Sequence, residues 1–239
     1  PAHRIPHLTT QKLTSLLSLA LFAATAAPSK SATEGWLDPE IFAVNRAPMR
    51  TSFIAFPSAA DAVPENDHTL SPLYRTLNGE WSFLRVDRPG AEPKGFFRTG
   101  HDDSSWGVMP VPGLWELNGY GDPVYTNKPY PWHKFFEVKP PQVPHEQNYT
   151  GLYRRTVAVP ASWKGRDVFI HIGSATSNVT LWVNGREAGY SEDSKLEAEF
   201  DITRFLKPGG DNLIVLRVNR WCDGSYLEDQ DFWRLSGIG

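Results

Sequence analysis

Cysteine is almost absent from this chain of 239 residues, in which Cys222 is the single example. One cysteine excludes an internal disulfide framework and any zinc site built from several cysteines. An excess of charge is also lacking, because the formal net charge is −3 and both signs are interspersed. The chain therefore offers no basic field to hold nucleic acid and no polybasic stretch to hold an anionic membrane.

Motifs for several common chemistries are missing as well. No Gly-rich phosphate loop opens a helix, no His-x-x-x-His pair offers metal ligands, and no G-x-S-x-G elbow presents a nucleophilic serine. Tryptophan, in contrast, is plentiful, with 9 residues. Because a buried Trp needs a partner for its N–H, we expect some of these rings to line a polar surface, and sugar rings are one class of partner.

The first residues predict export. The apolar stretch "LTSLLSLALFAATAA" follows Arg4 and Lys12, is too short to span a bilayer, and contains the small-x-small pattern Ala-Thr-Ala at 24–26. We predict that residues 1–27 are a signal peptide, which places the mature protein in the periplasm or outside the cell without a membrane span. The alternative is a buried or anchoring helix. Because Pro1 and not Met opens the chain, we expect an incomplete gene product or a fragment boundary here.

Beyond the signal, the chain divides into an arm and one β-rich domain. Residues 28–71 are rich in Ala, Pro, Asp and Asn without sustained periodicity, which predicts an extended arm with little regular structure. Residues 72–239 contain short alternating segments, such as "GLYRRTVAV" and "NLIVLRVNRW", separated by Gly, Pro, Asn and Asp. This pattern is typical of an all-β sandwich or jelly roll.

Two local signals refine this prediction. In "NVTLWV", Val179, Leu181 and Val183 share one face of a strand. The dipeptide Asn184-Gly185 follows, and both residues readily adopt positive φ, which predicts a tight hairpin. The segment "FDITRFLKPGG" is the one helical turn that we expect.

Several long motifs then point to a family. The stretches "LNGEWSF", "VPGLWELNGYGDPVYTNKPYP", "LWVNGREAGYSEDSKLEAEFDITRFL" and "WCDGSYLEDQDFWRLSGI" together resemble the amino-terminal part of large bacterial β-galactosidases of glycoside hydrolase family 2. The resemblance covers most of residues 36–238. It implies a sugar-binding-like jelly roll preceded by an arm that takes part in subunit assembly, and followed by a further sandwich domain and a catalytic barrel.

The resemblance implies roles for two polar residues. The family's Asp that matches Asp231 helps to bind a sodium ion and the galactosyl group, and the Asn that matches Asn127 contacts the sugar. A carboxylate and an amide at one rim of a sandwich exchange hydrogen bonds with sugar hydroxyls, so we expect these two residues to be near neighbours. Considered alone, Asn127 also suits a turn before Lys128, and Asp231 an ion pair with Arg234 or Arg220.

The resemblance further implies a magnesium site. The family's counterpart of Asp223 joins the ion with a side chain that matches Glu192 and with the arm, at positions that match Asp38 and the backbone carbonyl of Ile41. Carboxylates and carbonyls from separate segments suit a hard divalent cation, which would tie the arm to the sandwich. Gly35 stands where the best-known members carry an Asp, so we expect a rearranged or weaker site. The alternative for Asp223 is a plain turn with the glycine that follows it.

The stretch "EDQD" invites comparison with a catalytic carboxylate pair, which in a retaining glycosidase is separated by about 5–5.5 Å. Asp229 and Asp231 would approach that spacing on one face of a strand. Nothing in the sequence distinguishes an acid from a nucleophile between them, and both catalytic glutamates of the family lie in the barrel, beyond Gly239. We therefore assign no catalytic residue to this chain.

We interpret the chain as the amino-terminal portion of an exported β-galactosidase, whose catalytic carboxylates lie outside this sequence. It would bind a β-galactoside together with a downstream barrel, hold magnesium and sodium, and assemble through its arm into a homo-oligomer. The alternatives are a free-standing carbohydrate-binding module and an assembly domain that completes a separate catalytic chain. The final "RLSGIG" stops where the family continues into its next strand, which favours a truncated product over a tailored module.

Overall fold

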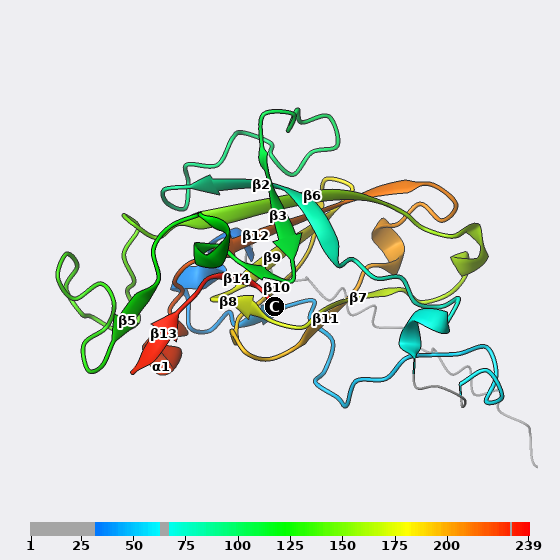
Figure 1. Ribbon diagram of the computed structural model, residues 1–239, viewed down its shortest axis with the longest axis horizontal. Coiled ribbons are helices and arrows are strands. Elements are labelled where there is room, and N and C mark those ends of the chain that lie inside the picture. The colour runs from blue at the N-terminus through cyan, green and yellow to red at the C-terminus, as the bar shows by residue number, and fades with distance from the viewer. Residues whose placement is uncertain (1–31, 63–66, 230) are drawn as a thin grey trace, which may run out of the picture. The chain divides into compact units, whose positions relative to one another are not determined.

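Short antiparallel strands form the layers of this all-β fold (Figure 1). The computed structural model describes residues 32–62, 67–229 and 231–239, so the predicted signal peptide at residues 1–27 lies outside the described residues. No helix within these described ranges has the length and the apolar character needed to cross a membrane.

One large sheet supplies the first layer. Its seven strands, in spatial order, are β1 (Ala43–Val44), β10 (Arg186–Ser191), β9 (Val179–Val183), β12 (Asp211–Asn219), β6 (Thr150–Ala158), β2 (Gly79–Val86) and β3 (Gly107–Val111). All neighbouring strands pair antiparallel. Strands far apart in sequence, such as β2 and β12, thus become neighbours of the same central strand β6.

Three smaller sheets complete the architecture. They are the pair β11 (Ala198–Asp201) and β7 (Phe169–Ile172), the triplet β4 (Gly113–Leu114), β14 (Gly237–Ile238) and β8 (Ala175–Thr176), and the pair β13 (Phe232–Arg234) and β5 (Val124–Thr126). The pair β5 and β13 lies beside helix α1 in Figure 1. The first two sheets share a core with the large sheet, which makes the domain a β-sandwich.

The core follows the alternation of the strands. Val179, Leu181 and Val183 of β9 lie in the central cluster between the sheets, as their spacing predicted, together with Phe200 of β11 and Ile238 of β14. A second cluster covers the outer face of the large sheet and includes Trp182, Leu213 and Val215. Strands β9 and β12 are therefore buried on both faces, which explains their nearly continuous apolar sequences.

The predicted hairpin is confirmed. Asn184 and Gly185 connect β9 to β10 with φ values of +52° and +80°. The Asn184 side chain donates a hydrogen bond to the carbonyl of Phe205 at 2.8 Å, and it accepts one from the Leu213 amide at 3.0 Å. This residue consequently joins the turn to two other segments.

The helical content was predicted only in part. The expected turn is the 3-10 helix η5, but the prediction that it is the one helical turn is wrong. The other helices are η1 (Ala32–Leu37), η2 (His68–Leu70), η3 (Glu116–Asn118), η4 (Ala161–Trp163) and α1 (Ser225–Glu228), and η5 itself spans Thr203–Phe205. Helices this short carry no periodic signal, because a single turn offers too few residues to show a 3.6-residue repeat.

The segment before the sandwich is mostly irregular and is docked at two points. β1 pairs with β10, so Ala43 lies opposite Ser191 and Val44 opposite Tyr190. Trp36 is buried in a third cluster, in which Trp132 and Trp221 also take part. The described part of this segment is thus bound to the domain by both main-chain pairing and aromatic packing.

Candidate functional site

The ladder between β5 and β13 brings the two predicted sugar-binding residues together. Thr126 pairs with Phe232 and Tyr125 with Trp233. Asn127 directly follows the last paired residue of β5, and Asp231 directly precedes the first paired residue of β13, so the two flank the same end of the ladder although they lie about a hundred positions apart in the sequence. Paired residues of an antiparallel ladder lie about 4.5–5.5 Å apart at their Cα atoms, which brings the segments that contain Asn127 and Asp231 close together.

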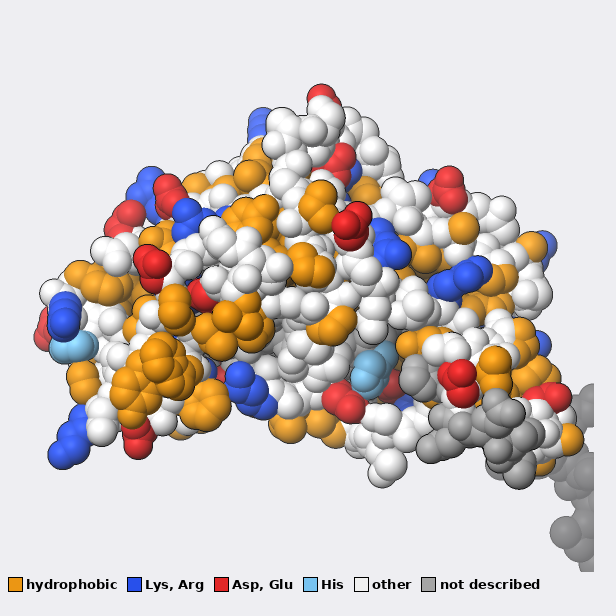
Figure 2. Space-filling model, viewed as in Figure 1, with side chains coloured by type: hydrophobic (Ala, Val, Ile, Leu, Met, Phe, Trp, Pro, Cys, Tyr) orange, Lys and Arg blue, Asp and Glu red, His pale blue; other side chains and the backbone are white. Residues whose placement is uncertain are grey.

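Both residues are exposed, and aromatic side chains surround them. Tyr125 donates a hydrogen bond from its hydroxyl to Asp231 Oδ1 at 2.8 Å. Phe232 is 50% exposed and Trp233 is 56% exposed. Figure 2 shows hydrophobic side chains gathered on the part of the surface where β5 and β13 lie.

Asp231 and the nearby Asp229 differ in their burial and in their partners. Asp229 is buried and forms an ion pair with the buried Arg234. Burial raises the pKa of Asp229, and the guanidinium of Arg234 opposes this shift. The ion pair of Asp231 with Arg234 or Arg220 is therefore not formed, since Arg220 donates instead to the carbonyl of Asp122 at 3.0 Å.

The comparison with a catalytic pair fails on the same geometry. The expectation that Asp229 and Asp231 share one strand face is wrong, because β13 begins only at Phe232 and Asp229 caps helix α1. Asp231 itself has a left-handed backbone with φ of +47°. One carboxyl group is buried and the other is exposed, so no sugar contacts both.

A sodium ion would find only part of a site at Asp231. Carboxylate oxygens suit hard cations, and Asp231 provides one exposed carboxylate. Within the part of the chain that the structure describes, it belongs to no group of three or more acidic, His or Cys side chains. The described residues fit a sodium ion only if further ligands join them.

A second candidate site is a buried acidic cluster of Glu192, Cys222 and Asp223. Their ligand atoms lie within 4.8 Å of one another, and all three residues are buried. Tyr190 donates a hydrogen bond from its hydroxyl to Glu192 Oε1 at 2.6 Å. Oδ2 of Asp223 is buried and has no hydrogen-bond partner among the described residues.

Electrostatics within this cluster favour an added positive charge. Burial raises the pKa of Glu192 to about 9, and the nearby charge of Asp223 acts in the same direction. Burial also raises the pKa of Asp223, with a further contribution from the charge of Asp38. Since buried carboxylates repel one another, a bound cation would stabilise their ionised forms.

Main-chain hydrogen bonds from the arm hold the two carboxylate residues of the cluster. The amide of Asp223 donates to the carbonyl of Trp36 at 3.0 Å, and the amide of Glu192 donates to the carbonyl of Phe42 at 3.0 Å. Asp38 and Ile41 lie in the turn between these points, where the Ile41 amide donates to the Asp38 carbonyl at 2.7 Å. The main chain of the arm therefore contacts the cluster on either side of Asp38 and Ile41, and their role as ligands stays a prediction.

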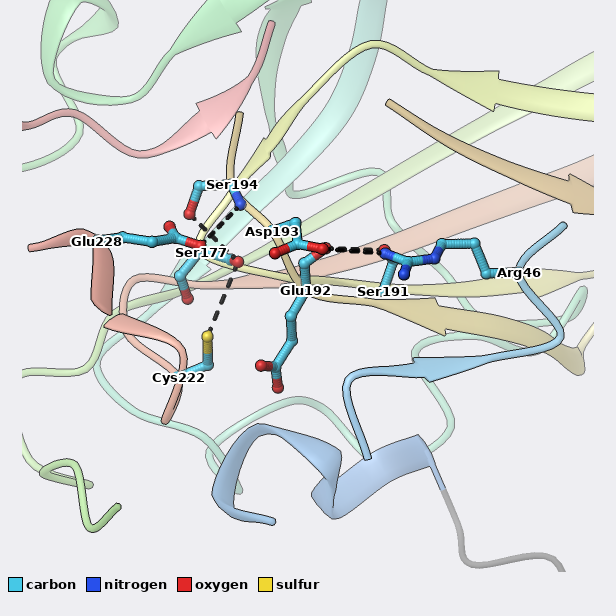
Figure 3. A network of polar contacts seen from close by, with 8 residues as sticks. All are labelled: Arg46, Ser177, Ser191, Glu192, Asp193, Ser194, Cys222 and Glu228. Atoms are coloured by element: carbon cyan, nitrogen blue, oxygen red, sulfur yellow. Dashed lines mark hydrogen bonds and ion pairs between the residues drawn. The ribbon is translucent and has the colours of Figure 1, made fainter. Parts of the chain in front are cut away.

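Polar contacts hold the segment on both sides of Glu192 (Figure 3). Arg46 of the arm donates to Ser191 Oγ at 2.9 Å, and the amide of Ser194 donates to Glu228 Oε1 at 3.2 Å. The Glu192 side chain extends toward the arm in Figure 3, with Cys222 beside it. These contacts fix the segment that carries Glu192, and the hydrogen bond from Tyr190 holds its carboxylate.

Gly35 has a steric role in this arrangement. A Cβ atom at this position would lie 2.8 Å from the ring of Tyr190. The Asp that the resembled family carries here therefore does not fit beside Tyr190 as placed. The Tyr190 ring occupies the space beside Gly35, and its hydroxyl donates a hydrogen bond to Glu192.

The cluster fits a hard divalent cation through its oxygen atoms. The buried Oδ2 of Asp223 without a partner is the observation that supports this fit, and Glu192 and Asp38 add two more carboxylates. The thiol of Cys222 suits a softer metal better than magnesium. The alternative turn is also present, because Asp223 Oδ1 accepts a hydrogen bond from the amide of Gly224 at 3.1 Å.

Sequence reasoning missed three features of these sites. Cys222 was considered only for disulfides and for zinc sites of several cysteines, and Tyr125 and Tyr190 were not considered as partners of carboxylates. The "VYT" stretch contained a signal, because Tyr125 lies two residues before Asn127 in an extended segment, where residues two apart share a face. No comparable signal in the sequence links Cys222 to Glu192.

Comparison with protein families agrees with the β-sandwich fold described above. The sequence profile described as "Glycosyl hydrolases family 2, sugar binding domain" matches residues 74–239. This match covers more than half of the chain. The chain belongs to glycosyl hydrolase family 2, as the sugar-binding domain of that family.

Curated relatives carry one enzyme name. The β-galactosidase of Priestia megaterium is 40% identical over 212 residues, which are 89% of this chain and 20% of that protein. The β-galactosidase of Psychromonas ingrahamii is 44% identical over 72% of this chain, and that of Yersinia pestis is 39% identical over 95%. The chain spans about 20% of the length of these relatives, or less.

Solved structures with this fold include a mutant of β-glucuronidase 2 from Bacteroides uniformis. The TM-score is 0.50 at 21% identity, over 68% of this chain and 16% of that one. At this level of identity, the likeness supports the fold alone.

Proposed function

We propose that this chain supplies part of the galactose-binding site of a β-galactosidase. The observation that supports the proposal is the β5 and β13 ladder, which ends at the pair Thr126 and Phe232, next to Asn127 and the exposed Asp231. The names of the curated relatives, at 37% to 44% identity, support the choice of galactose. Hydrolysis by the whole protein would use carboxylates outside this sequence.

Each side chain would have a distinct task. The amide of Asn127 donates and accepts hydrogen bonds, and the carboxylate of Asp231 accepts them, which matches a pair of sugar hydroxyls. The hydrogen bond from Tyr125 keeps Asp231 Oδ1 in one place. The exposed ring of Trp233 offers an apolar surface to the C–H face of the sugar.

The acidic cluster and the arm complete the proposal. We propose that Asp223, Glu192 and Asp38, with the carbonyl of Ile41, hold magnesium, and that Asp231 contributes to sodium binding. Bound magnesium would supply positive charge that ties the arm to the sandwich. Assembly of subunits through the arm and export of the protein belong to the same proposal.

Binding of D-galactose by the purified chain tests the sugar site. Half a site in an open surface is expected to bind with a dissociation constant in the millimolar range, which corresponds to about 4 kcal/mol. Nuclear magnetic resonance titration of the ¹⁵N-labelled chain measures it. Asp231→Asn should abolish the response, whereas Asp211→Asn, an exposed control on β12, should retain it.

Two further measurements separate the alternatives. D-glucuronate should bind more weakly than galactose because its carboxylate is repelled by Asp231, and the opposite order would favour a glucuronide-binding domain. The chain alone should not hydrolyse a β-galactoside, since it lacks the two catalytic groups. Turnover that disappears in Asp231→Asn would contradict this expectation.

A further inference from the structure

The buried ion pair of Asp229 and Arg234 flanks Asp231 in the sequence. Arg234 Nη2 contacts Asp229 Oδ1, and the side chains are only 3% and 2% exposed. The contact joins Asp229, two positions before Asp231, to Arg234, three positions after it. An ion pair in this place restrains where the exposed carboxylate between the two charges can lie.

Both ends of this ion pair are anchored in secondary structure. The amide of Asp229 donates to the carbonyl of Ser225 at 2.9 Å, which fixes it to the last turn of α1. Arg234 is the final residue of β13 and pairs with Val124 of β5. The ion pair therefore connects the end of helix α1 to the ladder of β5 and β13, which ends next to Asn127.

Each charge has the other as its direct ion-pair partner. Asp229 Oδ2 and Arg234 Nε are buried and have no hydrogen-bond partner among the described residues. The negative charge of Glu228 acts on both groups, unfavourably on Asp229 and favourably on Arg234. Removing one member of the pair therefore leaves a buried charge without its direct partner, which is unfavourable.

We propose that Asp229 and Arg234 are positioning residues, which hold Asp231 next to Asn127 through their buried ion pair. The role in sugar recognition rests on the proposed function. The restraint on the β5 and β13 ladder does not, because it depends only on contacts within this chain. Asp231 keeps its left-handed backbone and its hydrogen bond from Tyr125 while the ion pair is intact.

The test combines two measurements on the complete 239-residue chain. Amide hydrogen exchange reports on the residues paired between β5 and β13, and a titration with D-galactose reports on affinity. Asp229→Asn and Arg234→Met should each accelerate exchange in this ladder by at least about tenfold and weaken galactose binding by a similar factor. Arg234→Lys, which keeps the charge, should recover part of both effects.

A second ion pair, between the buried Arg154 and the partly exposed Asp103, provides the control. Arg154 Nε donates to Asp103 Oδ2 at 2.9 Å, on the outer face of the large sheet. Asp103→Asn should lower Tm without changing exchange in the β5 and β13 ladder or galactose affinity. A general loss of stability would act alike in both sets of variants, so this control separates it from positioning.

The outcomes are distinct. Wild-type exchange rates and wild-type galactose affinity in folded Asp229→Asn and Arg234→Met would overturn the proposal. If the wild-type chain binds no galactose, the proposed function fails, and the exchange measurement still decides whether the ion pair holds the ladder. If Arg234→Met does not fold, Asp229→Asn decides, because it keeps the volume of the side chain.

Discussion

The two candidate sites of this domain use carboxylates in opposite surroundings. Glu192 and Asp223 are buried beneath the arm, whereas Asp231 is exposed beside Asn127. Burial raises the pKa of both cluster residues, so a nearby positive charge would favour their ionised forms. The exposed carboxylate of Asp231 contacts solvent and accepts a hydrogen bond from Tyr125. One surrounding suits an internal ion, and the other suits a ligand that arrives from outside.

The largest effect on stability is expected when Trp36, which anchors the arm to the domain, is removed. Trp36→Ala should lower the free energy of unfolding by about 3–5 kcal/mol, because the ring is buried among Trp132 and Trp221. It should also remove any stabilisation by magnesium, while galactose binding persists. Denaturant unfolding with and without magnesium measures this, and Phe53→Ala, an exposed aromatic of the same segment, is the control. Equal loss of galactose binding would mean that the two sites are not independent.

Magnesium itself should stabilise the buried site and leave the open one unchanged. By mass action, a concentration of a hundred times the dissociation constant adds about 2.7 kcal/mol to the folded state. Thermal unfolding should show this increase for the wild-type chain and for Asp211→Asn, but not for Asp223→Asn. A melting curve that does not respond to saturating magnesium would support the plain turn at Asp223.

A methyl group at Gly35 should sharpen the account of why this site lacks an Asp there. Gly35→Ala should cost about 1–3 kcal/mol, because its Cβ would lie 2.8 Å from the Tyr190 ring. Gly100→Ala is the matched control, since no atom lies within 4 Å of its added Cβ. Equal Tm values for the two variants, measured by calorimetry, would show that Tyr190 moves aside without cost.

The smallest effect on stability is expected at the open site. Asp231→Asn should change the free energy of unfolding by no more than about 0.5 kcal/mol, because the side chain is exposed, while it abolishes galactose binding. Chemical denaturation and titration of the same sample provide both values. A loss of several kcal/mol would place Asp231 among the structural residues instead.

Local features of this fold could be predicted from the sequence, whereas its long-range partners could not. The hairpin at Asn184-Gly185 and the shared face of β9 follow from φ preferences and from the two-residue repeat, which are properties of neighbouring residues. The prediction that Asn127 and Asp231 are near neighbours came from the family resemblance, because no local sequence pattern links the ends of β5 and β13.

The choice of ion-pair partner shows the same limit. Arg234 has two aspartates close by in the sequence, and the sequence analysis considered only Asp231 as its partner, whereas Asp229 is the residue that pairs with it. Helix α1 decides the matter, because it ends at Glu228 and leaves Asp229 buried beside the guanidinium. A helix of one turn has too weak a signal to be predicted, so the choice that depended on it was not predictable either.

The pairing of β1 with β10 also affects how the protein meets other copies of itself. Without β1, the six residues of β10 would end the large sheet and present a row of free N–H and C=O groups, a template for adding foreign strands. β1 is the edge strand here, it has only two residues, and the charged Arg46 follows soon after them. An edge strand this short offers few free main-chain groups to a foreign strand, so the arm would protect the domain against fibrous aggregation.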